Sequence, residues 1–539
     1  MTTLIGPARN AEVRPGKRRR RLLGRPPGLW LWPLLATLAL ALYGIDGPQL
    51  GTDELVTWNV GERSTDRIWA LVHNVDAVHA TYYLLMHGWM AVFGDSQFAL
   101  RMPSALAMSG AAACVALIGN RLFGRRAGLC GGLLFVLIPA VSRFAQEARS
   151  YALVVLAATL ATYLLLRALD RTRSGWRWAA YGMCVAVVGL LHLVALTVVL
   201  GHVALLVFRF VRRERGGLWG FGLALAAGVA CVVPVVVLGR SQASRQLFWL
   251  AAPGAWGLVD IWPQVFASAL CAGVVITLAA LAWREAREGL VLCLTVAVVP
   301  PLVLWAASHG EVSYFRFQYA LFTVPAWAVL AGAGLARVTR PAGKSRLSVP
   351  ALPSPSLPSP SLPSQSSEPS EPALPARPSR RSWLPVVVGL AVLGLLVLPD
   401  QRRVRGPFEH DVPHAADYAG AARTIEKYYR PGDAVVYVRG APWMLDQGVR
   451  YYLQRDLKLP EVFLAKTAAE HDELYPVHCT QPAACLKGES RIWVVVPGNG
   501  PDSLDAVPGQ QARALRAKYT TYGSEQLSGL TVTLLQRKP

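Results

Sequence analysis

The stretch SYALVVLAATLATYLLLRA, residues 150–168, decides the fold class, because Arg167 is its only charged residue. A helix needs about 20 largely apolar residues to cross the hydrocarbon core of a bilayer, and this stretch is nearly that long. Residues 176–211 could form one long helix or two short ones that turn near His192, and we expect two, because only then do the basic connections all stay on one side of the membrane. Comparable stretches lie at 28–45, 98–119, 128–144, 218–238, 264–283, 289–306, 317–337 and 383–399. The sequence therefore predicts an α-helical polytopic membrane protein with about 11 transmembrane helices.

The composition of the 539-residue chain supports this class and excludes two others. Hydrophobic residues make up 53% of the chain and charged residues 16%, whereas soluble domains carry about 25% charged residues. These values do not fit a soluble enzyme. A wholly disordered chain is excluded as well, because disorder requires low hydrophobicity.

The net charge of +21 raises the question of nucleic acid, which would need a basic face on a soluble fold. The cations instead gather before the first apolar stretch, where KRRRR occupies residues 17–21, and in alternate connections between the stretches. Basic connections of this kind stay in the cytoplasm. We therefore expect a cell-membrane protein without a nucleic-acid partner, with a cytoplasmic N-terminus and an extracytoplasmic C-terminal segment. The connections concerned hold Arg121, Arg125, Arg126, Arg171, Arg173, Arg212, Arg213, Arg215, Arg284 and Arg287.

These patterns divide the chain into five segments. Residues 1–27 form a basic cytoplasmic N-terminus, and 28–340 form the membrane-spanning module, whose first external loop covers roughly 46–97. Residues 341–382 contain LPSPS repeats, which cannot bury a core, so we expect a disordered cytoplasmic Pro/Ser-rich linker. The last transmembrane helix is expected at 383–399, and 400–539 form a small extracytoplasmic domain.

The C-terminal segment has the pattern of a small α/β domain. Helical spacing at 415–429 is followed by short apolar runs at 434–438, 491–496 and 530–536, which predict strands. Cys479 and Cys485 are six residues apart, and in an oxidising compartment we expect them to form a disulfide.

The first external loop is too long and too acidic for a simple connector. It contains GTDE at 51–54 and HNVDAVHATYYLLMHGW at 73–89. Carboxylates and imidazoles at a membrane surface suit acid/base chemistry or metal ligation. An adjacent acidic pair also occurs at the start of helices, so Thr52 or Asp53 as an N-cap is the alternative interpretation.

Two further clusters lie at the external ends of predicted spans. QEARSY at 146–151 contains Glu147 and Arg149, and YFRFQY at 314–319 contains Arg316. Ionisable groups at the edge of the hydrocarbon are costly without a purpose, and a guanidinium binds phosphate with two parallel hydrogen bonds. These arginines would suit an anionic lipid headgroup, although Arg149 could instead extend its side chain to the interface. The neighbouring tyrosines Tyr82, Tyr83, Tyr151 and Tyr314 are either interface anchors or substrate contacts.

Four motifs in this order resemble a known group of enzymes. They are GTDELVTW at 51–58, DAVHATYYLLMHGWMAVFGDSQFALRMPSA at 76–105, RFAQEARSYAL at 143–153 and FRFQYALFTVPAWAVLAG at 315–332. They look like the membrane glycosyltransferases of the GT-C superfamily, in particular the protein O-mannosyltransferase and aminoarabinose-transferase-like group. The resemblance covers roughly residues 28–340.

The resemblance implies an activity and a donor. Enzymes of this group take a sugar from a polyprenyl-phosphate carrier on the external face of the membrane. They place the sugar on a hydroxyl of a protein, lipid or polysaccharide. An extracytoplasmic acceptor of this kind and the lipid bilayer are thus the expected partners.

The resemblance also implies roles for individual residues. Asp53 would orient or deprotonate the acceptor hydroxyl, with support from Glu54. The substrate-binding positions would be Asp76, His79, Tyr82, Tyr83, Glu147, Arg149, Tyr151 and Arg316, with the two arginines near the carrier phosphate.

The sequence bears on two kinds of cofactor, a nucleotide and a divalent cation. The lipid phosphate activates the sugar, and the chain has no G-x-x-x-x-G-K-[ST] motif for a nucleotide. Some GT-C enzymes use a divalent cation near the acidic loop, and Asp53, Asp76 and His79 are the residues here that could ligate one. The sequence does not decide whether a cation is used.

Two other function classes fit the sequence less well. A transporter or flippase of lipid-linked sugars would carry ionisable residues at mid-membrane and repeated halves; here the notable charges lie at span ends and no internal repeat is visible. A receptor or assembly protein that binds through the C-terminal domain would leave the acidic first loop without a role.

Overall fold

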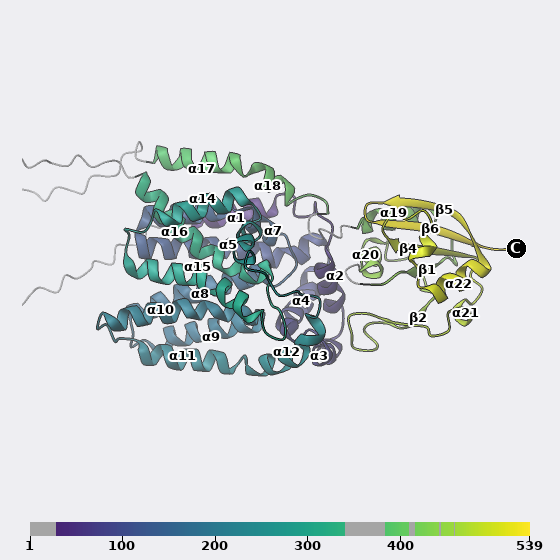
Figure 1. Ribbon diagram of the computed structural model, residues 1–539, viewed down its shortest axis with the longest axis horizontal. Helices are drawn as coiled ribbons and strands as arrows, with labels where there is room; N and C mark the ends of the chain where they lie inside the picture. The colour runs from purple at the N-terminus through teal and green to yellow at the C-terminus, as the bar shows by residue number, and fades with distance from the viewer. Residues whose placement is uncertain (1–27, 340–382, 409–415, 441–443, 458) are drawn as a thin grey trace, which may run out of the picture.

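The computed structural model describes residues 28–339, 383–408, 416–440, 444–457 and 459–539 (Figure 1). The predicted basic N-terminus 1–27 and the whole of the predicted Pro/Ser-rich linker 341–382 lie outside the described residues. The rest forms a helical bundle, with a small α/β domain at one of its ends.

The bundle confirms a multi-pass membrane protein. Among the described residues, five helices are long and apolar enough to cross a membrane, or up to eight when each sharply bent pair counts as one span. Shorter apolar helices add α1, α9 and α17 to the bundle. The bundle helices are α1 (Leu31–Leu42), α5 (Gln97–Phe123), α6 (Arg125–Leu137), α7 (Pro139–Ala145), α8 (Tyr151–Asp170), α9 (Gly175–Leu191), α10 (Val198–Val211), α11 (Leu218–Ala230), α12 (Val233–Gln246), α13 (Gly257–Phe266), α14 (Ala269–Ala280), α15 (Arg287–Ala307), α16 (Val324–Val338), α17 (Leu384–Leu396) and α18 (Leu398–Arg403).

Several spans are broken at identifiable residues. Between α6 and α7 the axis bends by 66° at Pro139, which has no backbone N–H to continue the helix. Between α13 and α14 it bends by 101° at Ala267, whose φ is +53°. The ambiguous stretch 176–211 is two helices, as predicted, because His192 is extended and a 3₁₀ turn, η2 (Leu193–Thr197), separates α9 from α10.

Close approach of backbones holds the centre of the bundle together. A side chain at Gly332 of α16 would collide with the backbone of Gly131 of α6. One at Gly128 would collide with the backbone of Ala116 in α5. Small residues at such crossings let membrane helices pack through van der Waals contact.

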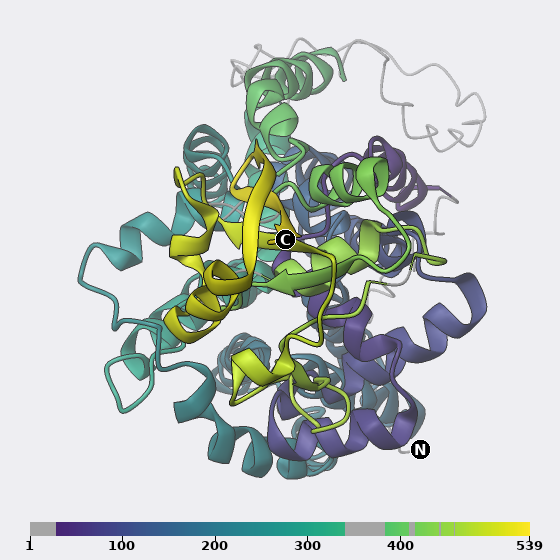
Figure 2. The same ribbon diagram turned by 90° about the vertical axis from the view of Figure 1, so that its right-hand side faces the viewer.

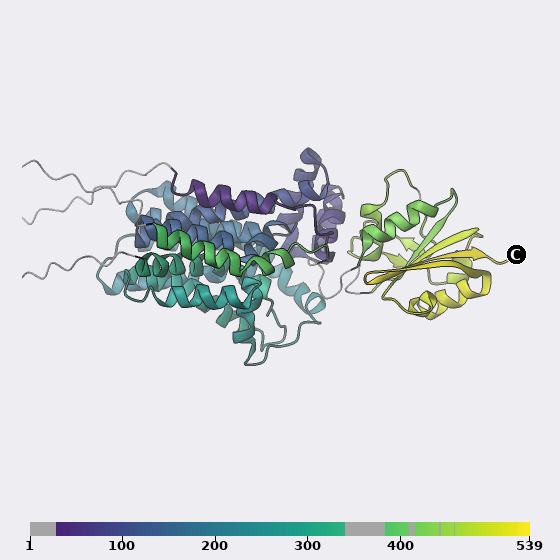
Figure 3. The ribbon, with the colours of Figure 1, turned by 90° about the horizontal axis from the view of Figure 1, so that it is seen from above.

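The predicted external loop folds into helices across one end of the bundle. These are α2 (Thr52–Gly61), α3 (Thr65–Asn74), the 3₁₀ turn η1 (Ala77–His79) and α4 (Ala80–Phe93). They lie beside the C-terminal domain in both side views (Figures 1 and 3). Before them, residues 45–51 connect α1 to α2; we call this segment the α1–α2 connector.

The C-terminal domain is a four-stranded mixed sheet with strand order β1-β4-β6-β5. Strand β1 pairs parallel with β4, while β4 with β6 and β6 with β5 are antiparallel. The strands of this sheet are β1 (Ala434–Tyr437), β4 (Arg491–Pro497), β5 (Tyr519–Leu527) and β6 (Leu530–Arg537); β2 (Leu464–Lys466) and β3 (Val477–His478) form a separate hairpin. The helices are α19 (Tyr418–Tyr428), α20 (Leu445–Tyr452), α21 (Pro482–Cys485) and α22 (Gly509–Lys518), with a 3₁₀ turn η6 (Ser503–Ala506).

The continuous apolar runs of β1 and β4 are explained by burial on both faces of the sheet. Val435 and Trp493 face one apolar core together with α19 and α20, while Val436 and Val494 face the other with α22. The predicted strands and helix of this domain are thus present. The predicted Cys479–Cys485 disulfide is confirmed.

The core on the α19–α20 side continues into the helices of the first loop. Leu55 and Trp58 of α2 belong to the same buried cluster as Tyr418, Leu445 and Val449 of the C-terminal domain. Viewed along the bundle, the domain lies over that end of the bundle (Figure 2). The domain and the first loop therefore share one hydrophobic core.

Candidate active site

Asp53 lies in the first turn of α2, at the end of the bundle that faces the C-terminal domain. Its side chain is 54% exposed, and its carbonyl oxygen accepts a hydrogen bond of 3.1 Å from Thr57 Oγ1. Asp53 is therefore an accessible carboxylate on a fixed backbone.

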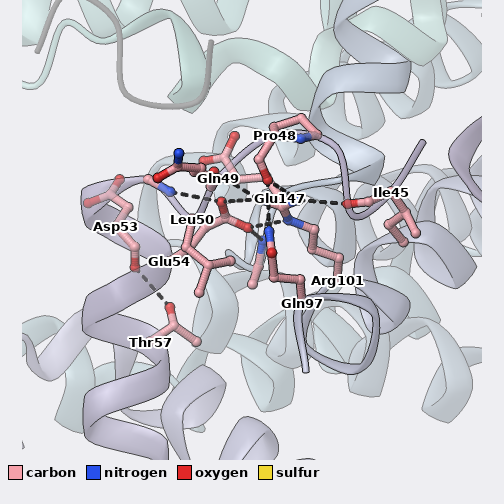
Figure 4. Close-up of polar contacts among 12 residues, drawn as sticks. Ile45, Pro48, Gln49, Leu50, Asp53, Glu54, Thr57, Gln97, Arg101 and Glu147 are labelled. Carbon is pink, nitrogen blue, oxygen red and sulfur yellow. Dashed lines mark hydrogen bonds and ion pairs between the residues drawn. The ribbon is translucent and has the colours of Figure 1, made fainter. Parts of the chain in front are cut away.

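Glu54, the neighbouring residue, lies in a different environment, since it is only 1% exposed. Its oxygens accept from Arg101 Nε at 2.9 Å and Arg101 Nη2 at 2.8 Å. They also accept from the backbone N–H of Gly51 at 3.1 Å and of Ala148 at 2.8 Å. Figure 4 shows Glu54 pointing into this group and Asp53 pointing away from it. Glu54 thus joins α2 to α5 and to the α7–α8 connection, and it holds the turn that carries Asp53.

Arg149, from the QEARSY motif at 146–151, lies next to Asp53. Its side chain is 7% exposed, and Nη2 lies 3.7 Å from the Asp53 carboxylate. The same nitrogen lies 3.4 Å from His79 Nε2. Burial, and then the charge of Arg149, lowers the pKa of His79 to about 4. His79 is therefore neutral near pH 7, and its Nε2 accepts from Arg149, which leaves the proton on Nδ1.

Asp76 and Tyr83 form a pair beside this group. Tyr83 Oη donates to an Asp76 carboxylate oxygen at 2.6 Å, and Gln246 of α12 donates to the other oxygen at 3.3 Å. Asp76 has φ +60°, in the left-handed region, where the chain turns from α3 into η1. The His79 ring packs 5.9 Å from the Tyr83 ring.

Buried polar atoms around Arg149 lack protein partners. Within the described part of the chain, His79 Nδ1, Tyr82 Oη and His192 Nδ1 have no hydrogen-bond partner. His192 packs against Tyr319 at 4.5 Å and against Tyr151 at 6.2 Å between ring centroids. Buried polar groups without a partner call for an explanation, and a bound polar ligand would supply one.

Two predicted residues have other partners in this structure. Glu147 forms an ion pair with Arg143, four residues earlier in the chain. Burial raises the pKa of Glu147 to about 6, against the opposing effect of Arg143. The Arg316 guanidinium lies over the Trp249 ring, 5.1 Å from its centroid.

Asp53, Asp76 and His79 do not form a ligand set. Among the described residues, no group of three or more His, Cys, Asp and Glu side chains is arranged to hold a metal ion. The carboxylate of Asp76 is engaged by Tyr83 and Gln246, and His79 Nε2 faces the cation Arg149. The residues present therefore do not fit a divalent cation.

Sequence reasoning did not assign roles to several residues of this region. His192 was recognised only as a turn, and Gln246 lies 170 residues from its partner Asp76. Tyr475 comes from the C-terminal domain, where burial, with Asp76, Asp446 and Asp53 nearby, raises its pKa. Only the Tyr319 position carried a signal, through its place in the quoted YFRFQY motif.

Comparison with known proteins places this arrangement in a wider group. A sequence profile described as dolichyl-phosphate-mannose-protein mannosyltransferase matches residues 80–238. The fold is similar to ArnT from Cupriavidus metallidurans in the apo state, at 15% identity over 94% of this chain and 98% of that one, with a TM-score of 0.54. The same ArnT bound to undecaprenyl phosphate gives a TM-score of 0.57 at the same identity and coverage. The chain has the GT-C glycosyltransferase fold. No curated protein sequence matches the chain.

The GT-C fold confirms the resemblance seen in the four motifs. The matched profile covers Tyr82, Tyr83, Glu147, Arg149 and Tyr151, but it begins after Asp53 and His79. Asp53, Glu54, Asp76 and His79 of the first loop thus lie outside the matched profile.

Proposed function

We propose that the protein transfers a sugar from a polyprenyl-phosphate donor to a hydroxyl acceptor, at the end of the bundle where the C-terminal domain lies. The observation that carries this proposal is an exposed carboxylate, Asp53, beside a buried cation, Arg149, with unpartnered polar atoms on His79 and Tyr82 around them. The undecaprenyl phosphate in ArnT supports a carrier of this chemical class. The sugar and the acceptor are not specified by this geometry.

The reaction is a single displacement at the anomeric carbon. The acceptor oxygen forms a bond to that carbon as the bond between the carbon and the phosphate oxygen breaks. Asp53 accepts the proton of the acceptor hydroxyl, while the carrier phosphate leaves with its negative charge. A fixed cation close to the leaving group stabilises that charge in the transition state.

The other residues divide between binding and support. Arg149 contacts the leaving phosphate, because it is buried and its charge is only loosely shared with Asp53 at 3.7 Å. His79 Nδ1 and Tyr82 Oη have no protein partner and can donate hydrogen bonds to oxygens of the polyprenyl-phosphate sugar. Glu54 supports Asp53 through its contact with Arg101. Asp76, Tyr83 and Tyr151 are further binding positions close to this group, and Glu147 and Arg316, which have other partners in this structure, remain proposed binding positions.

The same proposal includes an orientation in the cell membrane. In this orientation the basic N-terminus is cytoplasmic, and an odd number of spans, eleven, puts the first loop and the C-terminal domain on the other side. The position of α2 to α4 and the C-terminal domain at the same end of the bundle supports this arrangement.

The proposal is tested with lipid-linked and cell-envelope glycan profiles from cells with and without the protein. Loss of the protein should deplete one glycan and accumulate one polyprenyl-phosphate sugar, which identifies both substrates. Asp53→Asn and Arg149→Ala should each reproduce that profile at normal protein levels. The matched control is Asp66→Asn on α3, a carboxylate outside this group. Normal glycans in Asp53→Asn cells would refute the mechanism and favour transport of a lipid-linked sugar.

A further inference from the structure

The α1–α2 connector, residues 45–51, determines where Asp53 lies, because α2 begins directly after it. From the bundle side, Arg101 of α5 donates to the carbonyl oxygens of Ile45 at 2.6 Å, Pro48 at 2.9 Å and Gln49 at 3.1 Å (Figure 4). Arg101 is fully buried, so these bonds are shielded from water. One side of the connector is therefore fixed by the bundle.

The other side of the connector is held by the C-terminal domain. Gln49 Nε2 donates to Asp417 Oδ1 at 2.7 Å, and Gln49 Oε1 accepts from the backbone N–H of Ala419 at 3.1 Å. The backbone N–H of Leu50 donates to Tyr452 Oη at 2.8 Å. These partners are more than 360 residues away in the chain, so the contacts exist only when the C-terminal domain is docked.

The atoms that hold the connector are themselves rigid. Asp417 Oδ1 also accepts from the backbone N–H of Gly420 at 2.7 Å, which caps α19. Tyr452 is the last residue of α20 and packs edge-on against Tyr451, 4.9 Å between ring centroids. Tyr451 in turn packs edge-on against Trp58 of α2, 5.0 Å between centroids. The domain thus contacts both the connector and the helix that carries Asp53.

We infer that the C-terminal domain is part of the catalytic machinery, in which Asp417 and Tyr452 are positioning residues that hold the α1–α2 connector and so set the direction of Asp53. This inference rests on the proposed function. It differs from a role in covering the site, because it acts through the Gln49 side chain and the Leu50 backbone N–H rather than through substrate. Misplacement of a reacting group by about 1 Å is enough to cost about 100-fold in rate.

A swapped hydrogen-bond pair tests the inference in the full-length protein. Gln49→Glu places a second carboxylate against Asp417, and Asp417→Asn in the same chain restores a donor–acceptor pair. The readouts are the initial rate of sugar transfer in membranes, the retention of undecaprenyl phosphate by the purified protein, and amide hydrogen exchange of residues 49–55. Tyr452→Phe removes the acceptor for the Leu50 N–H, and Tyr522→Phe, at a position 70% exposed on β5, is its matched control.

Gln49→Glu should slow transfer by about tenfold or more and raise exchange in 49–55. Undecaprenyl phosphate should be retained as in the wild type, since its phosphate is assigned to Arg149. The double variant should recover most of the rate, Tyr452→Phe should behave like Gln49→Glu, and Tyr522→Phe like the wild type. A Gln49→Glu chain with wild-type rate and exchange, or a double variant no better than the single, would overturn the inference.

The two proposals fail in different ways. If the proposed function is wrong, Asp53→Asn leaves the glycan profile unchanged, whatever the exchange at 49–55. If only the positioning role is wrong, Asp53→Asn abolishes transfer while Gln49→Glu and Tyr452→Phe leave both transfer and exchange unchanged.

Discussion

Arg101→Met is the substitution for which the structure gives the largest local effect. The Arg101 guanidinium donates two hydrogen bonds to Glu54 and also bonds the carbonyl oxygens of Ile45, Pro48 and Gln49 in the α1–α2 connector. Methionine fills a similar length of space but offers no donor. The change leaves the Glu54 carboxylate, 1% exposed, without its cation. Removing one partner of a buried ion pair costs about 3–5 kcal/mol.

The lower bound of that range already gives a measurable effect. Each 1.4 kcal/mol is about a factor of ten in an equilibrium constant, so about 3 kcal/mol increases local opening by about two orders of magnitude. The backbone N–H groups of Gly51 and Ala148 still reach Glu54, which keeps the estimate at this bound. Amide exchange of residues 45–55, followed by mass spectrometry in nanodiscs, should therefore accelerate about 100-fold.

The matched control is Arg67→Met, which breaks an ion pair with Asp472 in which the two side chains are 49% and 27% exposed. Surface pairs contribute little, so exchange in 45–55 should stay at the wild-type rate. An acceleration below about tenfold in Arg101→Met, in a chain that expresses and elutes normally, would show that this pair does not hold the connector.

Three further substitutions have defined outcomes. His79 has a folded pKa of about 4, below its usual value, because of burial and then the charge of Arg149; only the unfolded chain takes up this proton between about pH 6.5 and 4. The melting temperature of the wild type should thus fall relative to that of His79→Gln as the pH drops from 7 to 5. An equal difference in melting temperature at both pH values would contradict the lowered pKa of His79. Gly332→Leu should abolish most folded protein on size-exclusion chromatography, because its side chain meets the backbone of α6, whereas Gly222→Leu, which meets nothing, should not. Cys479→Ser opens a six-residue disulfide loop and should lower the stability of the C-terminal domain by about 2 kcal/mol in denaturant melts; an unchanged midpoint would show that the disulfide adds nothing.

The helical bundle could be predicted from sequence because hydrocarbon imposes one simple requirement, a long apolar stretch. Each predicted stretch has a helix, and the break near His192 was predicted because two helices keep the basic connections on one side of the membrane. The sharp bend at Pro139 was not predicted, since the stretch 128–144 is apolar through it. Apolar composition thus predicts which segments cross the membrane, but it does not predict where a helix bends.

The C-terminal domain shows a similar division. The strands β1 and β4 were predicted because both of their faces are buried and their sequences are continuously apolar. Strand β5 (Tyr519–Leu527) was missed, since it is an edge strand with mostly exposed polar residues. An edge strand is held by backbone bonds to β6, which leave little trace in the side-chain pattern.

At the site, residue types were predictable and partnerships were not. The acidic pair Asp53–Glu54 was found as a motif, but nothing in it shows that one carboxylate is exposed and the other buried against Arg101. That difference depends on α5, about fifty residues later in the chain. The contact of Gln49 with Asp417 spans 368 residues, and no local pattern encodes it.

The core shared by the first loop and the C-terminal domain also has a consequence for biosynthesis. The ribosome makes α2 early and residues 416–453 much later. Leu55 and Trp58 therefore lack their packing partners Tyr418 and Leu445 through most of translation. Until then, the helix that carries Asp53 has an unfilled apolar face and an unsupported connector. A chain interrupted before α20 would reach the membrane with its bundle complete and its proposed reaction centre unassembled. Completion of synthesis would therefore act as the last step of enzyme maturation.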